Sequence, residues 1–269
     1  MTTETLTDPF DADAHRTRLA TAGNTTALRA SYAPGALPEL EDMSSADLWD
    51  DLAGYTEVPA FRLRRLRAVA GRVPPGAAVL DIGIGWGEII PMLRERGVGN
   101  YTGIDFSEQI VRQVAAKYPG YRFLVGGLDQ VQDTFDTVLA LEVCEHILPS
   151  RIFDFYARIR RVLRNDGRLI VSVPVYENLK ASTLRCPHCG HMHSRMGHVR
   201  AYTPELIEAE LALAGFEILD AFLLYASFDH STAGRLKRAV VDLGRRLLNL
   251  GRTLPLNIVL VARPAPAAS

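Results

Sequence analysis

The sequence predicts an α/β protein in which helices cover both faces of a parallel sheet. Short apolar runs of strand length, each bounded by turn residues, alternate with segments of helical periodicity. The runs are apolar throughout, which is typical of strands buried on both faces. They cover residues 77–82, 101–105, 121–125, 135–141 and 168–173. Because helical segments separate them along the chain, neighbouring strands are expected to run parallel.

Helical patterns precede or separate these strands. The first ends at Pro74-Pro75-Gly76. Its apolar stripe consists of Leu63, Leu66, Val69, Ala70 and Val73. The second stripe consists of Ile110, Val111, Val114, Ala115 and Tyr118, and the third of Ile152, Tyr156, Ile159 and Leu163. The third helix is expected to end before the turn Asn165-Asp166-Gly167, which places the start of the next strand at residue 168.

The C-terminal third departs from this alternation. Residues 175–200 form an irregular insertion that is rich in Cys and His. Thr203-Pro204 is expected to begin a helix that ends at Gly215. Two closing strands, FEILDAFLLY and NIVLVARP, then flank a basic helix at about residues 233–249.

These elements belong to one predicted domain, residues 59–263. Residues 1–58 are rich in Thr, Ala, Asp and Pro, and we expect a flexible start followed by a helical cap over the site. The composition of residues 264–269 predicts a disordered tail.

Composition and charge restrict the partners and the compartment. A net charge of -1 lacks the basic excess typical of proteins that bind nucleic acid. Three cysteines make no disulfide framework in a chain of this length, so we expect a reducing, cytoplasmic location. The N-terminus is acidic and polar, unlike a signal peptide, and no apolar run approaches the ~18 residues of a transmembrane helix. The oligomeric state stays open.

A glycine turn follows the first strand of the sheet. In VLDIGIGWGEII the glycines are Gly83, Gly85 and Gly87, and Asp81 precedes them. Such glycines let a ligand approach backbone N–H groups closely. The spacing differs from the Gly-x-Gly-x-x-Gly of dinucleotide-binding turns, and Asp81 would repel a phosphate but attract a cation. S-adenosylmethionine fits, since it carries an ammonium and a sulfonium group and no phosphate.

The next strand supplies a second acid. Asp105 ends the run YTGID, 22 residues after Gly83, where a carboxylate can accept both hydroxyls of a ribose. NAD suits this spacing as well, so Asp105 alone does not discriminate between the two cofactors. Asp81 and the glycine spacing distinguish the two cofactors, and both disfavour a nicotinamide oxidoreductase.

Together these motifs resemble those of the class I S-adenosylmethionine-dependent methyltransferases. The resemblance covers about residues 59–223 and includes VLDIGIGWGEII, YTGIDFS, FDTVLALEVCEHI and VLRNDGRLIVSVP. It implies a Rossmann-like, seven-stranded, mostly parallel sheet with helices on both faces and an antiparallel last strand. It also implies that S-adenosylmethionine is the cofactor.

The resemblance assigns a set of residues to this cofactor. They are Asp81, Gly83, Gly85, Gly87, Asp105, Phe106, Leu128, Asp129 and Leu141. The glycines would lie under the methionine moiety, with Asp81 directed toward its amino group through turn and water contacts. Asp105 would bind the ribose, and Phe106 would lie beside the adenine. The usual Gly-Asp of the third motif reads Gly126-Gly127 here, so the adenine-contacting acid is either shifted to Asp129 or missing.

Residues after the fourth strand provide the candidate catalytic groups. The resemblance places LEVCEHI at the methyl-donor end of the site, with Glu142, Glu145 and His146. His146 is the first candidate for the base that takes a proton from an acceptor hydroxyl, and Glu145 is its orienter or a substrate contact. In one alternative Glu145 and His146 merely line the site, because methyl transfer can proceed by positioning alone. In another, Glu142, Glu145 and His146 bind a divalent cation.

The insertion contains a candidate zinc site. Cys186 and Cys189 form a Cys-x-x-Cys knuckle, and three histidines follow closely enough to complete a tetrahedral, structural site. The predicted ligands are Cys186, Cys189, His193 and His198, with His191 as substitute. The stretch resembles a zinc-knuckle-like insertion found in a subset of class I methyltransferases. The segment that begins at His198 resembles one that recurs without cysteines in many relatives, where the matching histidine faces the substrate side, so the role of His198 stays open. The alternative is a metal-free, His-rich substrate loop.

These features predict a methyltransferase that acts on a small molecule, because the charge is balanced and the cap and insertion would enclose a pocket. A hydroxyl acceptor is favoured by the nearby His146 and Glu145. N-methyl transfer to an amino sugar or similar metabolite is the alternative among enzymes. The alternative outside the enzymes is a sensor or scaffold protein that binds S-adenosylmethionine without turnover.

Overall fold

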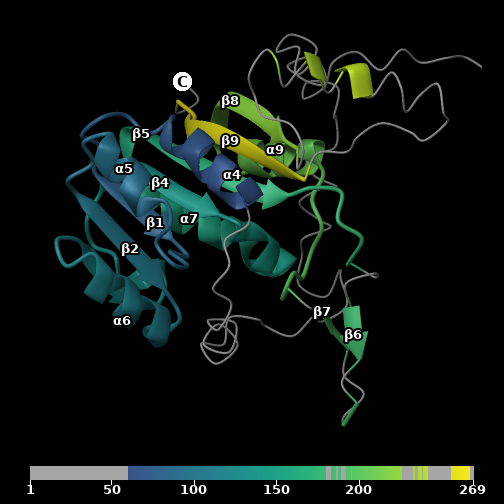
Figure 1. Ribbon diagram of the computed structural model, residues 1–269, viewed down its shortest axis with the longest axis horizontal. Coiled ribbons are helices and arrows are strands. Elements are labelled where there is room, and N and C mark those ends of the chain that lie inside the picture. The colour runs from purple at the N-terminus through teal and green to yellow at the C-terminus, as the bar shows by residue number, and fades with distance from the viewer. Residues whose placement is uncertain are drawn as a thin grey trace, which may run out of the picture.

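A seven-stranded sheet forms the centre of the protein (Figure 1). The computed structural model describes residues 60–179, 183–185, 187–188, 192–194, 196–225, 233, 236–237, 239–241 and 256–266. In chain order the strands of the sheet are β1 (Val79–Ile82), β2 (Tyr101–Asp105), β3 (Arg122–Val125), β4 (Phe135–Leu141), β5 (Leu163–Pro174), β8 (Phe216–Leu224) and β9 (Asn257–Pro264). Across the sheet their order is β3-β2-β1-β4-β5-β9-β8.

The strands from β3 to β5 run parallel to their neighbours, and β9 runs antiparallel to both β5 and β8. Val79 of β1 pairs with Tyr101 of β2 on one side and with Thr137 of β4 on the other. The strand order therefore reverses between β1 and β4, and ligands of such sheets bind outside the carboxyl ends of the strands at this point. The predicted sheet, including its antiparallel last strand, is confirmed.

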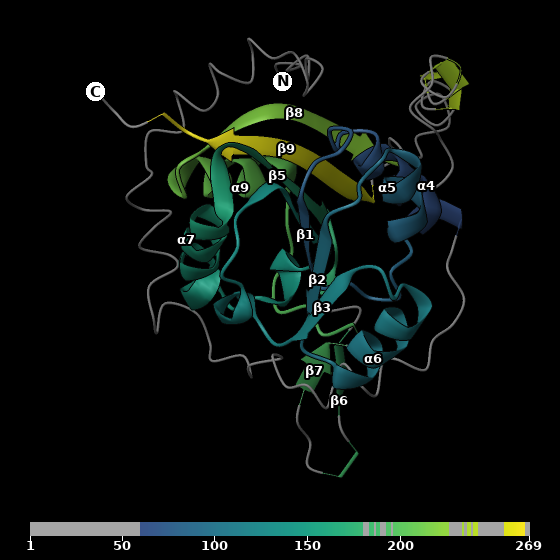
Figure 2. The same cartoon turned by 90° about the vertical axis from the view of Figure 1, so that its left-hand side faces the viewer.

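Helices cover both faces of the sheet (Figure 2). The helices on one face are α4 (Ala60–Ala70), α5 (Ile90–Glu95) and α6 (Glu108–Lys117). Those on the other face are α7 (Ile152–Val162) and α9 (Pro204–Leu213). Because successive side chains of a strand point to opposite faces, Val138 of β4 packs with α7 and α9, whereas Leu139 packs with α4 to α6. Burial on both faces explains why the strand sequences are continuously apolar.

Hydrogen-bonded caps define where two of these helices begin. The Ser107 hydroxyl accepts a hydrogen bond from the backbone N–H of Ile110 at the start of α6. Thr203 does the same for Leu206 at the start of α9, as expected from Thr203-Pro204. After α9, Gly215 has a φ of +80°, which ends the helix at the predicted glycine.

One strand is longer than the sequence predicts. β5 begins directly after α7, at Leu163, which pairs with Phe135 and does not belong to the helix. The next pair joins Thr137 to Arg168, so the residues between Leu163 and Arg168 bulge out of the ladder. The predicted turn Asn165-Asp166-Gly167 is therefore a bulge within β5, and the predicted start at residue 168 was wrong.

The insertion forms a small hairpin of its own. β6 (Thr183–Arg185) pairs antiparallel with β7 (Met192–Ser194), and both lie apart from the main sheet (Figures 1 and 2). Val175 forms a bridge with Tyr202, which brings the two ends of the insertion together. Short 3-10 helices complete the fold: η1 (Leu128–Gln130), η2 (Cys144–His146) and η3 (Pro149–Arg151).

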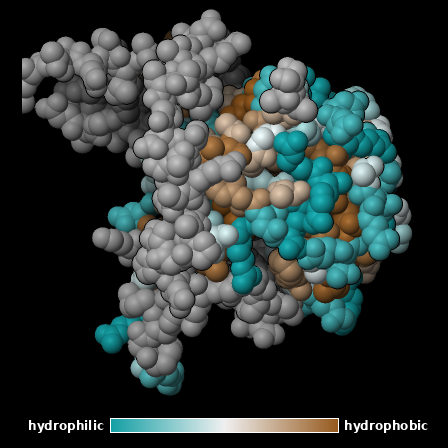
Figure 3. Space-filling view, turned by 180° about the vertical axis from the view of Figure 1, so that it is seen from behind, coloured by the Kyte–Doolittle hydropathy of each residue, from teal (hydrophilic) through white to brown (hydrophobic). Residues whose placement is uncertain are grey.

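Parts of the predicted organisation lie outside the described residues. They are segment 1–58, most of the basic helix at 233–249 and the end of the tail 264–269, so the domain boundaries stay predictions. Within the part of the chain that the structure describes, no helix is long and apolar enough to cross a membrane. On the face seen in Figure 3, apolar residues lie in patches between polar ones.

Candidate functional site

The glycine turn lies at the carboxyl end of β1, where the strand order reverses. Gly83, Gly85 and Gly87 have φ values of +72°, +49° and +68°, a conformation that residues with a Cβ rarely adopt. At Gly87 a Cβ would lie 3.0 Å from the side chains of Ile90 and Val114. The backbone of the turn therefore depends on glycine for both conformation and space.

Asp105, the last residue of β2, contacts this turn. Its Oδ2 accepts a hydrogen bond from the Gly85 N–H at 3.4 Å, and its Oδ1 accepts one from the Ser107 N–H at 3.0 Å. These bonds orient the carboxylate beside the turn. Phe106 follows with 46 % of its surface exposed, and a Cβ at Gly127 would lie 3.4 Å from its ring. An acid thus adjoins the glycine turn, and an exposed aromatic ring follows it in the chain and lies beside Gly127.

Asp81 lies within the sheet, below the turn. Its side chain is buried, and its Oδ2 accepts a hydrogen bond from the Tyr101 hydroxyl at 2.7 Å. Burial raises the pKa of Asp81 to about 7, with smaller contributions from the charges of Asp105 and Glu88. The predicted role toward the cofactor's amino group stays a prediction. Tyr101, its partner on the neighbouring strand, had no signal in the sequence, because only the register of β1 and β2 brings the two together.

The other residues assigned to the cofactor lie after β3 and at the end of β4. The Gly126 N–H donates to the Asp105 carbonyl at 2.8 Å, and Leu128 is buried at the start of η1. Asp129 forms an ion pair with Arg158 of α7. Leu141 is half-buried at the end of β4. The pair with Arg158 gives Asp129 a structural role, and its contact with adenine stays a prediction.

Glu142 follows β4 with a φ of +58°, a strained conformation for a residue other than glycine. Its carboxylate accepts hydrogen bonds from the Ser172 hydroxyl at 2.8 Å and the Asn257 amide at 2.7 Å. Arg65 of α4 forms an ion pair with it at 2.6 Å. The carboxylate is thus held by three elements of the fold, and the sequence did not reveal these distant partners.

Glu145, in η2, has quite different surroundings. Its side chain is fully buried, and neither carboxylate oxygen has a hydrogen-bond partner among the described residues. Burial raises the pKa of Glu145 well above its usual value, and the charge of Glu142 adds to the shift. A buried carboxyl group of this kind is rare in folded proteins.

Two imidazole rings lie beside this carboxyl group. The ring centroids of His146 and His198 are 4.9 Å apart. Nδ1 of His146 lies 3.1 Å from the Gly197 carbonyl oxygen, and Nδ1 of His198 lies 2.8 Å from Oε2 of Glu177. One possible ligand atom from each of Glu145, His146 and His198 lies within 4.8 Å of the others. Burial, together with His198, lowers the pKa of His146 to about 4, so its ring is neutral near pH 7.

The structure thus brings His198 to the residues that follow β4. The sequence resemblance leaves His198 open between the zinc knuckle and the substrate side. The structure does not describe the side chains of the other predicted zinc ligands. Cys186, Cys189 and the substitute His191 lie outside the described residues, and only the backbone of His193 is described, in β7. The predicted zinc site therefore stays a prediction.

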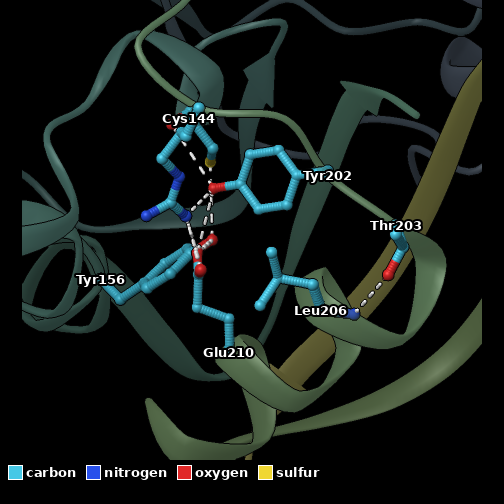
Figure 4. Close-up of polar contacts among 7 residues, drawn as sticks. Cys144, Tyr156, Tyr202, Thr203, Leu206 and Glu210 are labelled. Carbon is cyan, nitrogen blue, oxygen red and sulfur yellow. Dashed lines mark hydrogen bonds and ion pairs between the residues drawn. The ribbon is translucent and has the colours of Figure 1, made fainter. Parts of the chain in front are cut away.

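The segment after the insertion is fixed against η2. The Val199 N–H donates to the Glu145 carbonyl at 2.9 Å, and the Tyr202 hydroxyl oxygen lies 3.4 Å from the Cys144 carbonyl oxygen. Figure 4 shows this hydroxyl between Cys144 and Glu210 of α9. These contacts place residues 197–202 next to Glu145.

A buried ion pair strengthens this arrangement. Nη2 of Arg200 lies 2.6 Å from Oε1 of Glu210, and the same carboxylate accepts hydrogen bonds from Tyr156 and Tyr202 at 3.1 Å each. Glu210 is fully buried on the face of α9 that also carries Leu211. A charged residue on a buried helix face is the signal that could have indicated such a partner.

Comparisons with known proteins agree with this architecture. The methyltransferase-domain family model matches residues 80–171. Cyclopropane mycolic acid synthase MmaA2 of Mycobacterium tuberculosis is 28% identical over 103 residues, which are 36% of this chain and 36% of that protein. The chain therefore matches about a third of the length of this curated relative.

Solved structures match over a larger part of the chain. An S-adenosylmethionine-dependent methyltransferase from Archaeoglobus fulgidus is 19% identical with a TM-score of 0.54, covering 75% of this chain and 92% of its own. The 1,6-didemethyltoxoflavin-N1-methyltransferase of Burkholderia thailandensis is also 19% identical, with a TM-score of 0.55 and coverage of 97% and 94%. At such identities the likeness concerns the fold. Residues 80–171 therefore match a methyltransferase domain, and the chain has the fold of the S-adenosylmethionine-dependent methyltransferases.

Proposed function

We propose that the protein transfers a methyl group from S-adenosylmethionine to a small-molecule acceptor, and that the accepting atom is a hydroxyl oxygen. The glycine turn, Asp105 and the pair Glu145–His146 all lie at the carboxyl ends of the neighbouring strands β1, β2 and β4. This juxtaposition carries the proposal, because ligands bind at this edge of doubly wound sheets. All of these residues fall within the matched methyltransferase domain.

The residues around the turn suit this cofactor. Asp105 offers carboxylate oxygens for the ribose hydroxyls, and the exposed ring of Phe106 suits an adenine face. Asp81 places a carboxyl group below the turn. A neighbouring cation favours the charged form of such a group, so the ammonium and sulfonium of S-adenosylmethionine suit the site better than a phosphate would. Leu128 and Leu141 are proposed as apolar contacts at the edge of this site.

Positioning is the main task of the chain in such a reaction. Bound S-adenosylmethionine would supply a methyl group whose leaving group, a neutral thioether, is already activated. Holding two reactants in line contributes up to about 7–11 kcal/mol in favourable cases. Asp105 and the glycine turn would fix the donor side, and the residues after β4 would fix the acceptor.

A hydroxyl acceptor must also lose its proton. His146 is neutral near pH 7, which is the form that accepts a proton, and Glu145 lies beside it to hold the acceptor or orient the ring. A pKa of about 4 nevertheless makes His146 a weak base unless another group lowers the pKa of the hydroxyl. The proposal therefore assigns proton removal to this pair, with positioning as the larger contribution.

The test is a methyl-transfer assay on the purified full chain. Methyl-labelled S-adenosylmethionine is incubated with pairs of metabolites that differ only in carrying a hydroxyl or an amine, and products are analysed by mass spectrometry. We expect methylation of hydroxylated members, its loss in Asp105→Ala and its retention in Asp133→Ala, a change at an exposed position remote from the turn. Methylation of amines alone would favour the N-methyltransferase. Cofactor binding without any methylation, unaffected by His146→Ala, would favour the sensor.

A further inference from the structure

The carboxyl group of Glu145 is the most unusual polar group among the described residues. It is fully buried, and neither of its oxygens has a hydrogen-bond partner in the part of the chain that the structure describes. Buried charged groups are normally paired or coordinate a metal, because an isolated buried carboxylate is costly. Two imidazoles, a type of side chain that coordinates cations, lie close to it.

Both imidazoles are oriented as metal-ligating histidines are. The Gly197 carbonyl and the Glu177 carboxylate can only accept hydrogen bonds, so Nδ1 of His146 and Nδ1 of His198 each carry the proton. In this tautomer Nε2 of each ring bears the lone pair with which an imidazole coordinates a cation. Metal-ligating histidines almost always donate their other N–H to a carboxylate or a backbone carbonyl, and here one of each is present.

The cluster is held together by the surrounding structure. The backbone bond between Val199 and Glu145 and the buried pair of Arg200 with Glu210 fix residues 197–202 against η2. His198 therefore reaches the residues that follow β4 from a segment that is more than fifty positions later in the chain. Because both η2 and residues 197–202 are already held in place, the site can bind a ligand without a prior ordering step.

We propose that Glu145, His146 and His198 bind one divalent transition-metal ion, such as Zn2+, Mn2+ or Co2+, with Glu177 orienting His198. One possible ligand atom from each of the three residues lies within 4.8 Å of the others, which suits a shared ion. Two imidazoles with one carboxylate favour this class of ion over Mg2+ and Ca2+, which prefer oxygen ligands.

This site differs from both cation arrangements that the sequence indicated. Glu142 does not take part, since Arg65, Ser172 and Asn257 already hold its carboxylate. If His198 belongs to the new site, His191 takes its place in the predicted zinc knuckle, which then still has four candidate ligands. These are Cys186, Cys189, His191 and His193.

The role of the ion rests on the proposed methyltransferase function. Three protein ligands leave a coordination position for the acceptor oxygen, and coordination lowers the pKa of a hydroxyl. The hydroxyl proton passes to solvent water, the oxygen lone pair forms the new C–O bond, and the C–S bond breaks with its electron pair going to sulfur. With an ion bound, Nε2 of His146 is a ligand and cannot take a proton, so the ion replaces the general base proposed for His146 above.

Metal binding is tested on the full chain without S-adenosylmethionine. Protein stripped with a chelator is titrated with Co2+, whose visible absorption reports its coordination, in the Cys186→Ser/Cys189→Ser background that removes the predicted knuckle. We expect a single ion to bind in this background. Glu145→Gln and His198→Gln should each weaken binding at least about 100-fold, since even the groups that orient a metal ligand contribute about 10- to 100-fold.

Glu217→Gln is the matched control, because Glu217 lies on the edge strand β8 and pairs with Arg263. We expect the Glu217→Gln variant to bind Co2+ with the same affinity as the Cys186→Ser/Cys189→Ser background protein. Unchanged affinity in Glu145→Gln, or no binding in the background with folding intact, would overturn the site. Methyl transfer at full rate after complete chelation would overturn the role of the ion and leave the methyltransferase function standing.

Discussion

At the scale of single residues, the fold holds two acids in surroundings that disfavour their charged forms. Asp81 lies inside the sheet beside Tyr101, and Glu145 lies buried beside His146 and His198. Burial is the main reason that the pKa of each carboxyl group is raised. A cation nearby reverses this effect, because it favours the charged form. Both positions therefore suit cationic ligands, the cofactor at Asp81 and a metal ion at Glu145.

The raised pKa of Asp81 predicts that the protein becomes less stable as the pH rises. The pKa is about 7 in the folded protein against 3.8 for an ordinary aspartate, so between these values the folded state binds more protons than the unfolded state. The contribution of neutral Asp81 is fully present below the lower value and is lost as the pH rises through the upper one. Between these two pH values, the contribution of Asp81 to the free energy of unfolding falls by about 4 kcal/mol.

Urea unfolding of the wild type and Asp81→Asn over a pH series checks this prediction. The asparagine does not titrate, so the free energy of unfolding of the wild type should fall relative to that of the variant as the pH rises from about 4 to about 7. Asp133→Asn, a change at an exposed position, is the control and should leave the pH dependence unchanged. Parallel curves for the wild type and Asp81→Asn would contradict the burial of a titrating Asp81.

Asp105→Ala should lose affinity for S-adenosylmethionine without unfolding. Hydrogen bonds to a charged group contribute about 1.5–3 kcal/mol each, so the loss of the ribose contact should weaken binding by about 100-fold. Calorimetric titration measures the affinity, and circular dichroism during heating checks the fold. Unchanged affinity in a folded variant would rule out the ribose assignment.

At the scale of elements, α9 and the segment after the insertion position one side of the site. Glu210 of α9 is fully buried and pairs with Arg200, while Val199 donates to the Glu145 carbonyl. Glu210→Gln should lower the free energy of unfolding by about 3–5 kcal/mol, because it leaves the Arg200 charge buried without its counterion. Urea denaturation measures the effect.

The control for this change is Glu217→Gln, which disrupts a half-exposed ion pair with Arg263. Exposed pairs contribute about 0–1 kcal/mol, so this variant should remain close to the wild type. Equal effects of Glu210→Gln and Glu217→Gln would show that the buried pair does not support the segment.

At the scale of the whole molecule, the sequence predicted the sheet because strand burial leaves a local signal. Continuous apolar runs marked β1 to β4, and Thr203-Pro204 marked the start of α9. The bulge between Leu163 and Arg168 was missed, because Asn165-Asp166-Gly167 has the composition of a turn in either setting. Whether these residues form a turn or a bulge depends on how β5 pairs with β4, a strand that is distant in the sequence.

The candidate site was predictable only in part, for the same reason. The glycine turn, Asp105 and the Glu145–His146 pair each lie in a contiguous motif and could be identified from the sequence. For His198 the sequence leaves two roles open, a ligand of the zinc knuckle and a residue on the substrate side, because its approach to Glu145 depends on how the insertion returns to the sheet. Asn257, which holds Glu142, is still more distant in the chain.

Titration calorimetry with S-adenosylmethionine, S-adenosylhomocysteine and NADH, run in parallel on the metal-replete full chain, tests the central claim most directly. The claim is that the turn at Gly83, Gly85 and Gly87, with Asp105 beside it, binds an adenosyl ligand that carries no phosphate. We predict binding of both adenosyl ligands and none of NADH. Binding of NADH alone would contradict the cofactor assignment and the proposed methyl transfer with it.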